Sequence, residues 1–62
     1  MTSAELREAR QAMGLSQAAM SKRLGVSLRM YRYWEAGRWP VPETVALAVK
    51  YLLHEQDNYF SR

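Results

Sequence analysis

The sequence contains no cysteine, and this absence excludes disulfide bonds and thiolate metal sites. Its single histidine, His54, cannot by itself supply a metal-ligand cluster or an activated nucleophile. Carboxylates paired at a spacing suited to acid–base catalysis are also missing. We therefore predict that the chain is not an enzyme, with no catalytic residue, no metal site and no cofactor.

Long hydrophobic runs are absent as well. No apolar stretch approaches the roughly 18 residues that a spanning helix needs, and the polar segment 1–8 cannot be the hydrophobic part of a secretory signal. We expect a cytoplasmic protein with no membrane partner. The hydrophobic fraction of 48% argues against disorder, and 62 residues suffice for one small domain, 1–62.

Basic residues exceed acidic ones, nine against six, which gives a formal charge of +3. Such an excess favours a polyanionic partner, although many small soluble domains are equally basic. Charge alone therefore does not identify nucleic acid as the ligand.

Glycine and proline are scarce, and they divide the chain. Gly14, Gly25, Gly37 and the segment 40–42 separate four stretches with helical patterns, and none resembles a strand. The predicted helices span about 3–13, 17–24, 28–36 and 42–54, followed by a frayed or loosely docked tail at 56–62. These features predict an all-α bundle of short helices.

Capping residues agree with these boundaries. The predicted N-caps are Ser3, Ser16 and Ser27, since a serine hydroxyl can accept from a free amide at a helix start. Gly14 and Gly25 can adopt the left-handed conformation that ends a helix. Pro42 is expected in the first turn of the fourth helix.

The third predicted helix has two different faces. Tyr31, Trp34 and Glu35 point to one side, which favours core packing for the two aromatic rings over base stacking. Arg29, Arg32 and Tyr33 point to the other side. Without further context, this second group would be an ordinary solvated face.

A helix, a glycine-containing turn and a second helix follow one another between Ser16 and Ala36. Helices joined by so short a turn cross steeply, and the second can enter the major groove of DNA. Small residues at Ala18, Ala19 and Ser21 permit close helix approach. This order of elements predicts a helix-turn-helix.

Three motifs at family spacing strengthen this prediction. They are Gly14-Leu15-Ser16-Gln17, Leu24-Gly25-Val26-Ser27 and Trp34-Glu35-Ala36-Gly37-Arg38. Together they resemble the Cro and C1-repressor (XRE) family of helix-turn-helix proteins over about 6–52. The resemblance implies a compact, lambda-repressor-like bundle of four or five helices. The segment 33–38 with Val41-Pro42 also resembles the anti-CRISPR-associated autorepressors of phages and mobile elements.

The resemblance also implies DNA contacts. The residues expected at base edges are Leu28, Arg29, Arg32 and Tyr33. The guanidinium of Arg29 can donate twice to guanine, a contact worth about 1 to 3 kcal/mol of discrimination. The residues expected at phosphates are Ser16, Gln17, Lys22, Arg23, Arg38 and Thr44. Matching family positions further imply a structural ion pair between Arg10 and Glu35, and a bracing role for Gln17.

The fourth predicted helix has more apolar surface than one bundle can cover. Val45, Ala48, Val49 and Leu52 form one apolar face, while Leu47 and Tyr51 lie nearly opposite. A homodimer interface at Leu47 and Tyr51 would cover the second face. Packing of the same two residues within a monomer is the alternative.

We therefore expect a transcriptional repressor that binds double-stranded DNA sequence-specifically as a dimer. Two-fold symmetry would place two recognition helices roughly 34 Å apart on an inverted-repeat operator, within its own promoter. No small-molecule ligand is expected, because a chain this short leaves no domain to sense one. An antitoxin-like protein-interaction module and an RNA-binding domain are the alternatives.

Overall fold

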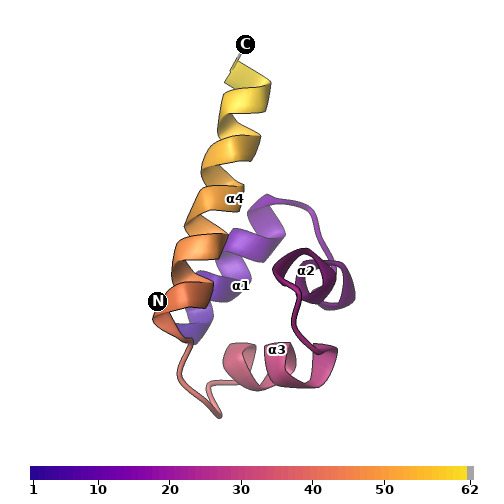
Figure 1. Ribbon diagram of the computed structural model, residues 1–62, viewed down its shortest axis with the longest axis vertical. Coiled ribbons are helices and arrows are strands. Elements are labelled where there is room, and N and C mark those ends of the chain that lie inside the picture. Colours follow the sequence, from indigo (N-terminus) through magenta and orange to yellow (C-terminus); the bar gives the residue numbers. More distant parts are fainter. Residues whose placement is uncertain (62) are drawn as a thin grey trace.

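The computed structural model describes the backbone of residues 1–61 and the side chains of residues 1–56. Four α-helices follow along the chain: α1 (Ser3–Ala12), α2 (Gln17–Leu24), α3 (Leu28–Glu35) and α4 (Glu43–Ser61) (Figure 1). The described backbone contains no strand. The predicted all-α fold is therefore confirmed, with four helices.

The first helix begins at Ser3, as predicted, but its N-cap lies one residue earlier than the predicted cap. Thr2 Oγ1 accepts from the Glu5 amide at 3.1 Å, and Glu5 Oε1 accepts from the Thr2 amide at 2.8 Å. This reciprocal capping box makes Thr2 the N-cap, so the prediction of Ser3 was wrong. Only Thr2 has a glutamate three residues later, whereas Ser3 is followed at that spacing by Leu6.

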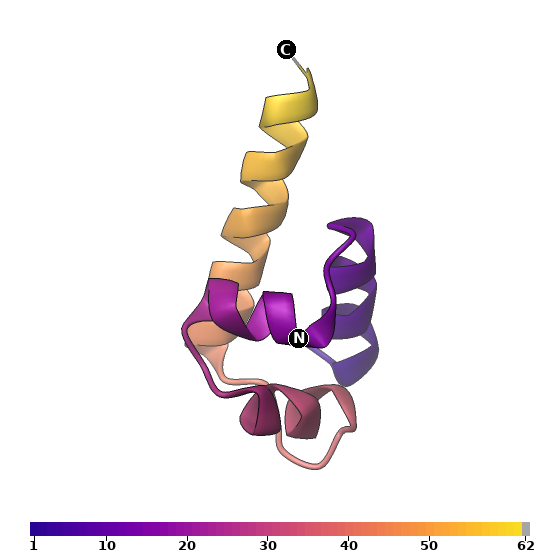
Figure 2. The same cartoon turned by 90° about the vertical axis from the view of Figure 1, so that its right-hand side faces the viewer.

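The boundaries of α2 and α3 agree with the predicted caps. Ser16 Oγ accepts from the Ala19 amide and Ser27 Oγ from the Met30 amide, each at 3.1 Å. Gly25 ends α2 in the left-handed conformation, with φ of 72°. The connection between the helices is short, and Figures 1 and 2 show that α2 and α3 cross steeply.

Each helix contributes a fully buried side chain to one core. Leu6 of α1, Met20 of α2, Tyr31 of α3 and Val49 of α4 are all inaccessible to solvent. The ring of Trp34 meets that of Tyr31 edge to face, with centroids 6.4 Å apart. Because the four helices share this core, α3 is held from several directions.

The fourth helix is rotated relative to its predicted orientation. Ala46 and Val49 are buried, whereas Ala48 is exposed, so the assignment of Ala48 to the core face was wrong. Nearly every residue from 45 to 53 is apolar, and the hydrophobic pattern therefore does not fix which face is inside. Leu47 and Tyr51 remain exposed, at 56% and 64% of their surface.

The same helix differs from its predicted bounds at both ends. It begins at Glu43 rather than Pro42, whose carbonyl accepts from the Ala46 amide at 3.0 Å. It continues to Ser61, past the predicted end near 54, because glycine and proline are absent from this stretch. Its second half extends beyond the other helices (Figure 2). The predicted loose docking of the tail concerns side chains outside those described, apart from Gln56, whose amide donates to the Ala12 carbonyl at 3.4 Å.

The described residues form neither a membrane-spanning helix nor a cluster of metal-ligating side chains. None of the helices between residues 1 and 61 combines the length and apolar character needed to cross a bilayer. Within the described part of the chain, no three potential metal-ligating side chains lie close enough together to hold an ion.

Candidate nucleic-acid interface

Helix α3 buries one face and exposes the other, as its sequence predicts. Tyr31, Trp34 and Glu35 have at most 5% of their surface exposed. Arg29 and Arg32 on the opposite side are exposed, and Tyr33 is half-buried. The buried face determines where the basic outer face can lie.

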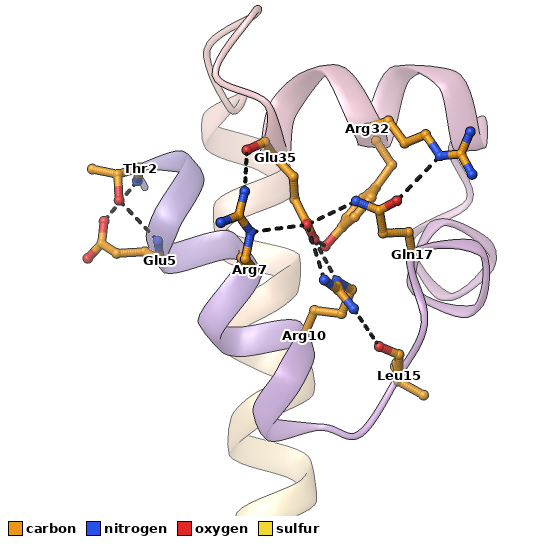
Figure 3. Close-up of polar contacts among 9 residues, drawn as sticks. Thr2, Glu5, Arg7, Arg10, Leu15, Gln17, Arg32 and Glu35 are labelled. Atoms are coloured by element: carbon orange, nitrogen blue, oxygen red, sulfur yellow. Dashed lines mark hydrogen bonds and ion pairs between the residues drawn. The ribbon is translucent and has the colours of Figure 1, made fainter.

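A buried carboxylate, that of Glu35, anchors the inner face of α3 (Figure 3). Arg10 of α1 donates to it twice, from Nε at 2.7 Å and from Nη2 at 3.2 Å. The Tyr31 hydroxyl donates to Oε2 at 2.5 Å, and Gln17 Nε2 of α2 donates to Oε1 at 3.1 Å. Glu35 therefore joins three helices. Its contacts include the ion pair with Arg10 that the family resemblance implied.

The pKa shifts in this cluster keep Glu35 charged and keep its hydrogen-bond partners protonated. Burial raises the pKa of Glu35, but hydrogen bonds from Arg10, Tyr31 and Gln17 outweigh it, and the net pKa is lowered. The hydrogen bond to Glu35 raises the pKa of Arg10. Burial and the same carboxylate raise the pKa of Tyr31. At neutral pH the glutamate therefore remains an acceptor and its partners remain donors.

Two further contributions to this cluster were not anticipated. Arg7 Nη2 donates to the backbone carbonyl of Glu35 at 3.3 Å, and its Nε lies 3.7 Å from the carboxylate. Arg7 precedes Arg10 by three residues, so both lie on one side of α1, and this spacing was the available signal. For Tyr31 the sequence pattern predicts packing alone, although its spacing of four residues from Glu35 permits the hydrogen bond.

Gln17 connects the buried carboxylate with the exposed face. Its Oε1 accepts from Arg32 Nε at 3.3 Å while its Nε2 donates to Glu35 (Figure 3). The side chain is half-buried at the start of α2. Gln17 therefore contacts both Arg32 on the outer face of α3 and Glu35 on its inner face.

On the outer face, the structure brings together three of the predicted contact residues. Arg29 Nε donates to the Tyr33 hydroxyl at 2.9 Å. The guanidinium carbons of Arg29 and Arg38 lie 5.7 and 5.1 Å from the centroid of the Tyr33 ring. Arg38 also donates from its backbone amide to the Tyr33 carbonyl at 2.9 Å. Two cations therefore share one aromatic ring at the surface.

The remaining predicted contact residues lie around α3. Leu28 is half-buried at its first position. Lys22 and Arg23 are exposed in the last turn of α2, and Thr44 is exposed in the first turn of α4. Ser16 is exposed while its hydroxyl caps α2. All of the described basic side chains in this group are open to a ligand.

Comparison with known families identifies the fold that carries this surface. Residues 6–52 match the model of a helix-turn-helix family, the Cro and C1-repressor (XRE) type. The chain belongs to this family. The match covers α1 to α3 and the first half of α4, and it confirms the resemblance to the Cro and C1-repressor family and the lambda-repressor-like fold. Neither the curated proteins nor the solved structures contain a match.

Family membership indicates which kind of partner the exposed face of α3 binds. Helix-turn-helix domains of this type bind DNA, and family membership implies DNA binding by this domain. Helix α3 is the second helix of the motif and therefore its recognition helix. It lies at the end of the molecule away from the C-terminus of α4 (Figure 1).

Proposed function

We propose that this helix-turn-helix domain is a sequence-specific transcriptional repressor that binds double-stranded DNA as a homodimer in the cytoplasm. One observation carries the proposal: Glu35 anchors the inner face of α3 while Arg29, Arg32 and Tyr33 occupy its outer face. A helix whose backbone is already fixed in position loses little conformational freedom on binding, and this favours discrimination between sequences.

The proposed contacts divide into base readers and phosphate binders. Leu28, Arg29, Arg32 and Tyr33 would face base edges from the recognition helix. Around them, Ser16, Gln17, Lys22, Arg23, Arg38 and Thr44 would contact phosphates. Gln17 supports this division, because an amide nitrogen has two N–H groups and only one is used by Glu35.

Dimerisation is supported by the surface of α4. Leu47 and Tyr51 are four residues apart, so they lie on one side of the helix, and both are largely exposed. A two-fold contact through them would bury this apolar surface. The operator would then be an inverted repeat with half-sites about one DNA turn apart.

Repression of the protein's own promoter is the regulatory role we favour. A dimer bound across a promoter blocks access of polymerase without any additional activity. The resemblance of residues 33–38 and 41–42 to anti-CRISPR-associated autorepressors supports a function of this kind in a phage or mobile element. Occupancy of the promoter would follow the concentration of the protein.

The proposal can be tested by selecting bound duplexes from a random library. The affinity for the selected duplexes is then measured at several salt concentrations. Arg29→Ala should relax preference at one base pair, by about 1 to 3 kcal/mol. Arg38→Ala should weaken binding to all duplexes alike and reduce the slope of log K against log salt by about 0.9.

Lys50→Ala is the matched control, because it removes the same charge from an exposed position on α4. It should leave both sequence preference and salt slope close to those of the wild type. Absence of binding to any duplex at low salt would contradict the proposal.

The exposed face of α4 also favours a second candidate, an antitoxin-like module that holds a protein partner there. In that case a stoichiometric partner should copurify, and both Leu47→Glu and Tyr51→Glu should break the complex without loss of DNA binding. Competition between DNA and RNA duplexes of matched sequence separates either candidate from RNA binding, which the narrow major groove of RNA disfavours.

A further inference from the structure

We infer that Tyr33 is a positioning residue, which holds Arg29 so that it reads guanine through the two terminal nitrogens of its guanidinium. This inference rests on the proposed function and adds the base that one position of the half-site should contain. It also gives Tyr33 a role through Arg29 in place of the base contact of its own that was proposed above.

The geometry of the outer face supports this role. Arg29 and Tyr33 are four residues apart on α3, so their side chains are neighbours. The hydrogen bond from Arg29 Nε to the Tyr33 hydroxyl, at 2.9 Å, engages the one N–H on the inner side of the guanidinium. The other four N–H groups are on Nη1 and Nη2, at the exposed end of the side chain.

This arrangement leaves one mode of base recognition open. A guanidinium can form a bidentate contact sideways, with Nε and one terminal nitrogen, or end-on, with both terminal nitrogens. The bond to Tyr33 uses Nε and therefore selects the end-on mode. Guanine presents two adjacent acceptors, O6 and N7, whereas adenine presents one acceptor beside a donor. The end-on fork thus matches guanine.

Tyr33 is itself held in place by Arg38. The Tyr33 ring is half-buried, the Arg38 guanidinium carbon lies 5.1 Å from its centroid, and the Arg38 amide donates to the Tyr33 carbonyl. The ring is therefore less free than that of an ordinary surface tyrosine. A fixed hydroxyl gives Arg29 a defined direction before DNA arrives.

Arg32 shows the same arrangement independently. Its Nε donates to Gln17 Oε1 at 3.3 Å, and its terminal nitrogens are likewise left for a ligand. Both arginines of the outer face therefore have an internal acceptor at Nε. The shared arrangement supports orientation of the guanidinium groups as a property of this surface.

Nuclear magnetic resonance of the free protein tests the geometry without DNA. Exchange of the Arg29 Nε–H with solvent should be slower than that of Arg23, whose side chain is exposed at the end of α2. Tyr33→Phe removes the hydroxyl and retains the ring, so exchange at Arg29 should become about as fast as at Arg23. Equal exchange in the wild type would overturn the inference.

Binding to the selected operator tests the consequence. In the Tyr33→Phe variant, preference for guanine at the Arg29 position should fall about 2- to 10-fold, the effect of one hydrogen bond. Affinity for a non-specific duplex should stay nearly constant, because Arg29, Arg38 and the ring are all retained. A merely structural role for Tyr33 would weaken binding to both duplexes equally, and that result would also overturn the inference.

A double-mutant cycle separates action through Arg29 from direct contact with DNA. If Tyr33 acts through Arg29, Tyr33→Phe should cause no further loss of preference in the Arg29→Ala background. Additive losses would show that Tyr33 contacts DNA itself, and they would overturn the inference. Specific binding without guanine preference would overturn the inference and leave the proposed function intact, whereas absence of any duplex binding would overturn both.

Discussion

A buried carboxylate with partners on three helices, such as Glu35, stabilises a fold only while its partners balance its charge. Its side chain is 2% exposed, and that of Arg10 is 16% exposed. Loss of the carboxylate charge would leave Arg10 in a half-buried position with no full counter-charge. The carboxylate therefore contributes to holding the recognition helix against α1 and α2.

We expect Glu35→Gln to lower the free energy of unfolding by about 3 kcal/mol, the lower part of the range for breaking a buried ion pair. Urea denaturation measures this loss. Glu8→Gln, at an exposed position of α1, is the matched control and should change stability by less than about 0.5 kcal/mol. Equal effects of the two substitutions would contradict the anchoring role.

The same residue should make stability depend on acid pH. Because folding lowers the pKa of Glu35, its contribution is fully present above the unfolded-state pKa, about 4.3, and is lost as pH falls through the lower folded-state value. The free energy of unfolding of the wild type should therefore decrease below about pH 5. The Glu35→Gln variant should show a shallower decrease in the same urea titrations, and an unchanged slope would contradict the assignment.

At the residue scale, the sequence predicted which face of α3 each side chain occupies better than it predicted which residues that side chain contacts. Helical periodicity separates Tyr31, Trp34 and Glu35 from the outer arginines, since it depends only on the angle between successive residues. Contacts such as Arg7 with Glu35 or Arg29 with Tyr33 also depend on side-chain rotamers, and these are not encoded in the spacing. The candidate surface was therefore predictable, and its internal hydrogen bonds were not.

At the scale of elements, the turn between α2 and α3 determines how the recognition helix leaves its neighbour. Gly25 has a φ of 72°, and a Cβ built there would meet no atom within 4 Å. The cost of a side chain is thus backbone strain alone, without a clash. Gly25→Ala should lower the free energy of unfolding by about 1 kcal/mol, as measured by urea denaturation.

Gly25→Asn should cost less than Gly25→Ala, because asparagine tolerates the left-handed conformation better. An alanine variant as stable as the wild type would contradict the strain argument. A loss of several kcal/mol would indicate a steric conflict that the open space around Gly25 does not predict.

Elements also differ in how well sequence defines them. Ser16, Ser27 and Gly25 mark helix ends clearly, because each is the only suitable capping residue at its boundary. Thr2 and Ser3 are both suitable, and the choice is made by Glu5 three residues after Thr2. In α4, apolar residues surround the helix, so the buried face of Ala46 and Val49 is determined by the other three helices.

At the scale of the whole molecule, the two proposed surfaces lie on different helices. The molecule measures 38 × 19 × 17 Å, and its long dimension follows α4, with α3 at the opposite end from the C-terminus (Figures 1 and 2). The exposed side chains of Leu47 and Tyr51 belong to α4, whereas the basic outer face belongs to α3. The two proposed contacts therefore do not compete for the same helix.

If Leu47 lies in a two-fold interface, Leu47→Glu should separate the protomers, because two added carboxylates would face each other across an apolar contact. Sedimentation should then detect a monomer under conditions where the wild type is dimeric. Affinity for an isolated half-site should be retained, since α3 is unchanged. Affinity for the complete inverted repeat should fall by about 10²-fold or more, because the second contact is no longer linked to the first.

Ala4→Glu is the matched control for this prediction, because it adds the same charge at an exposed position in the first turn of α1. It should leave both the oligomeric state and the preference for the complete operator unchanged. A Leu47→Glu variant that remains dimeric and still prefers the inverted repeat would exclude this face of α4 as the interface. Since a small recognition helix contacts few base pairs, specificity would then have to come from a second copy joined elsewhere.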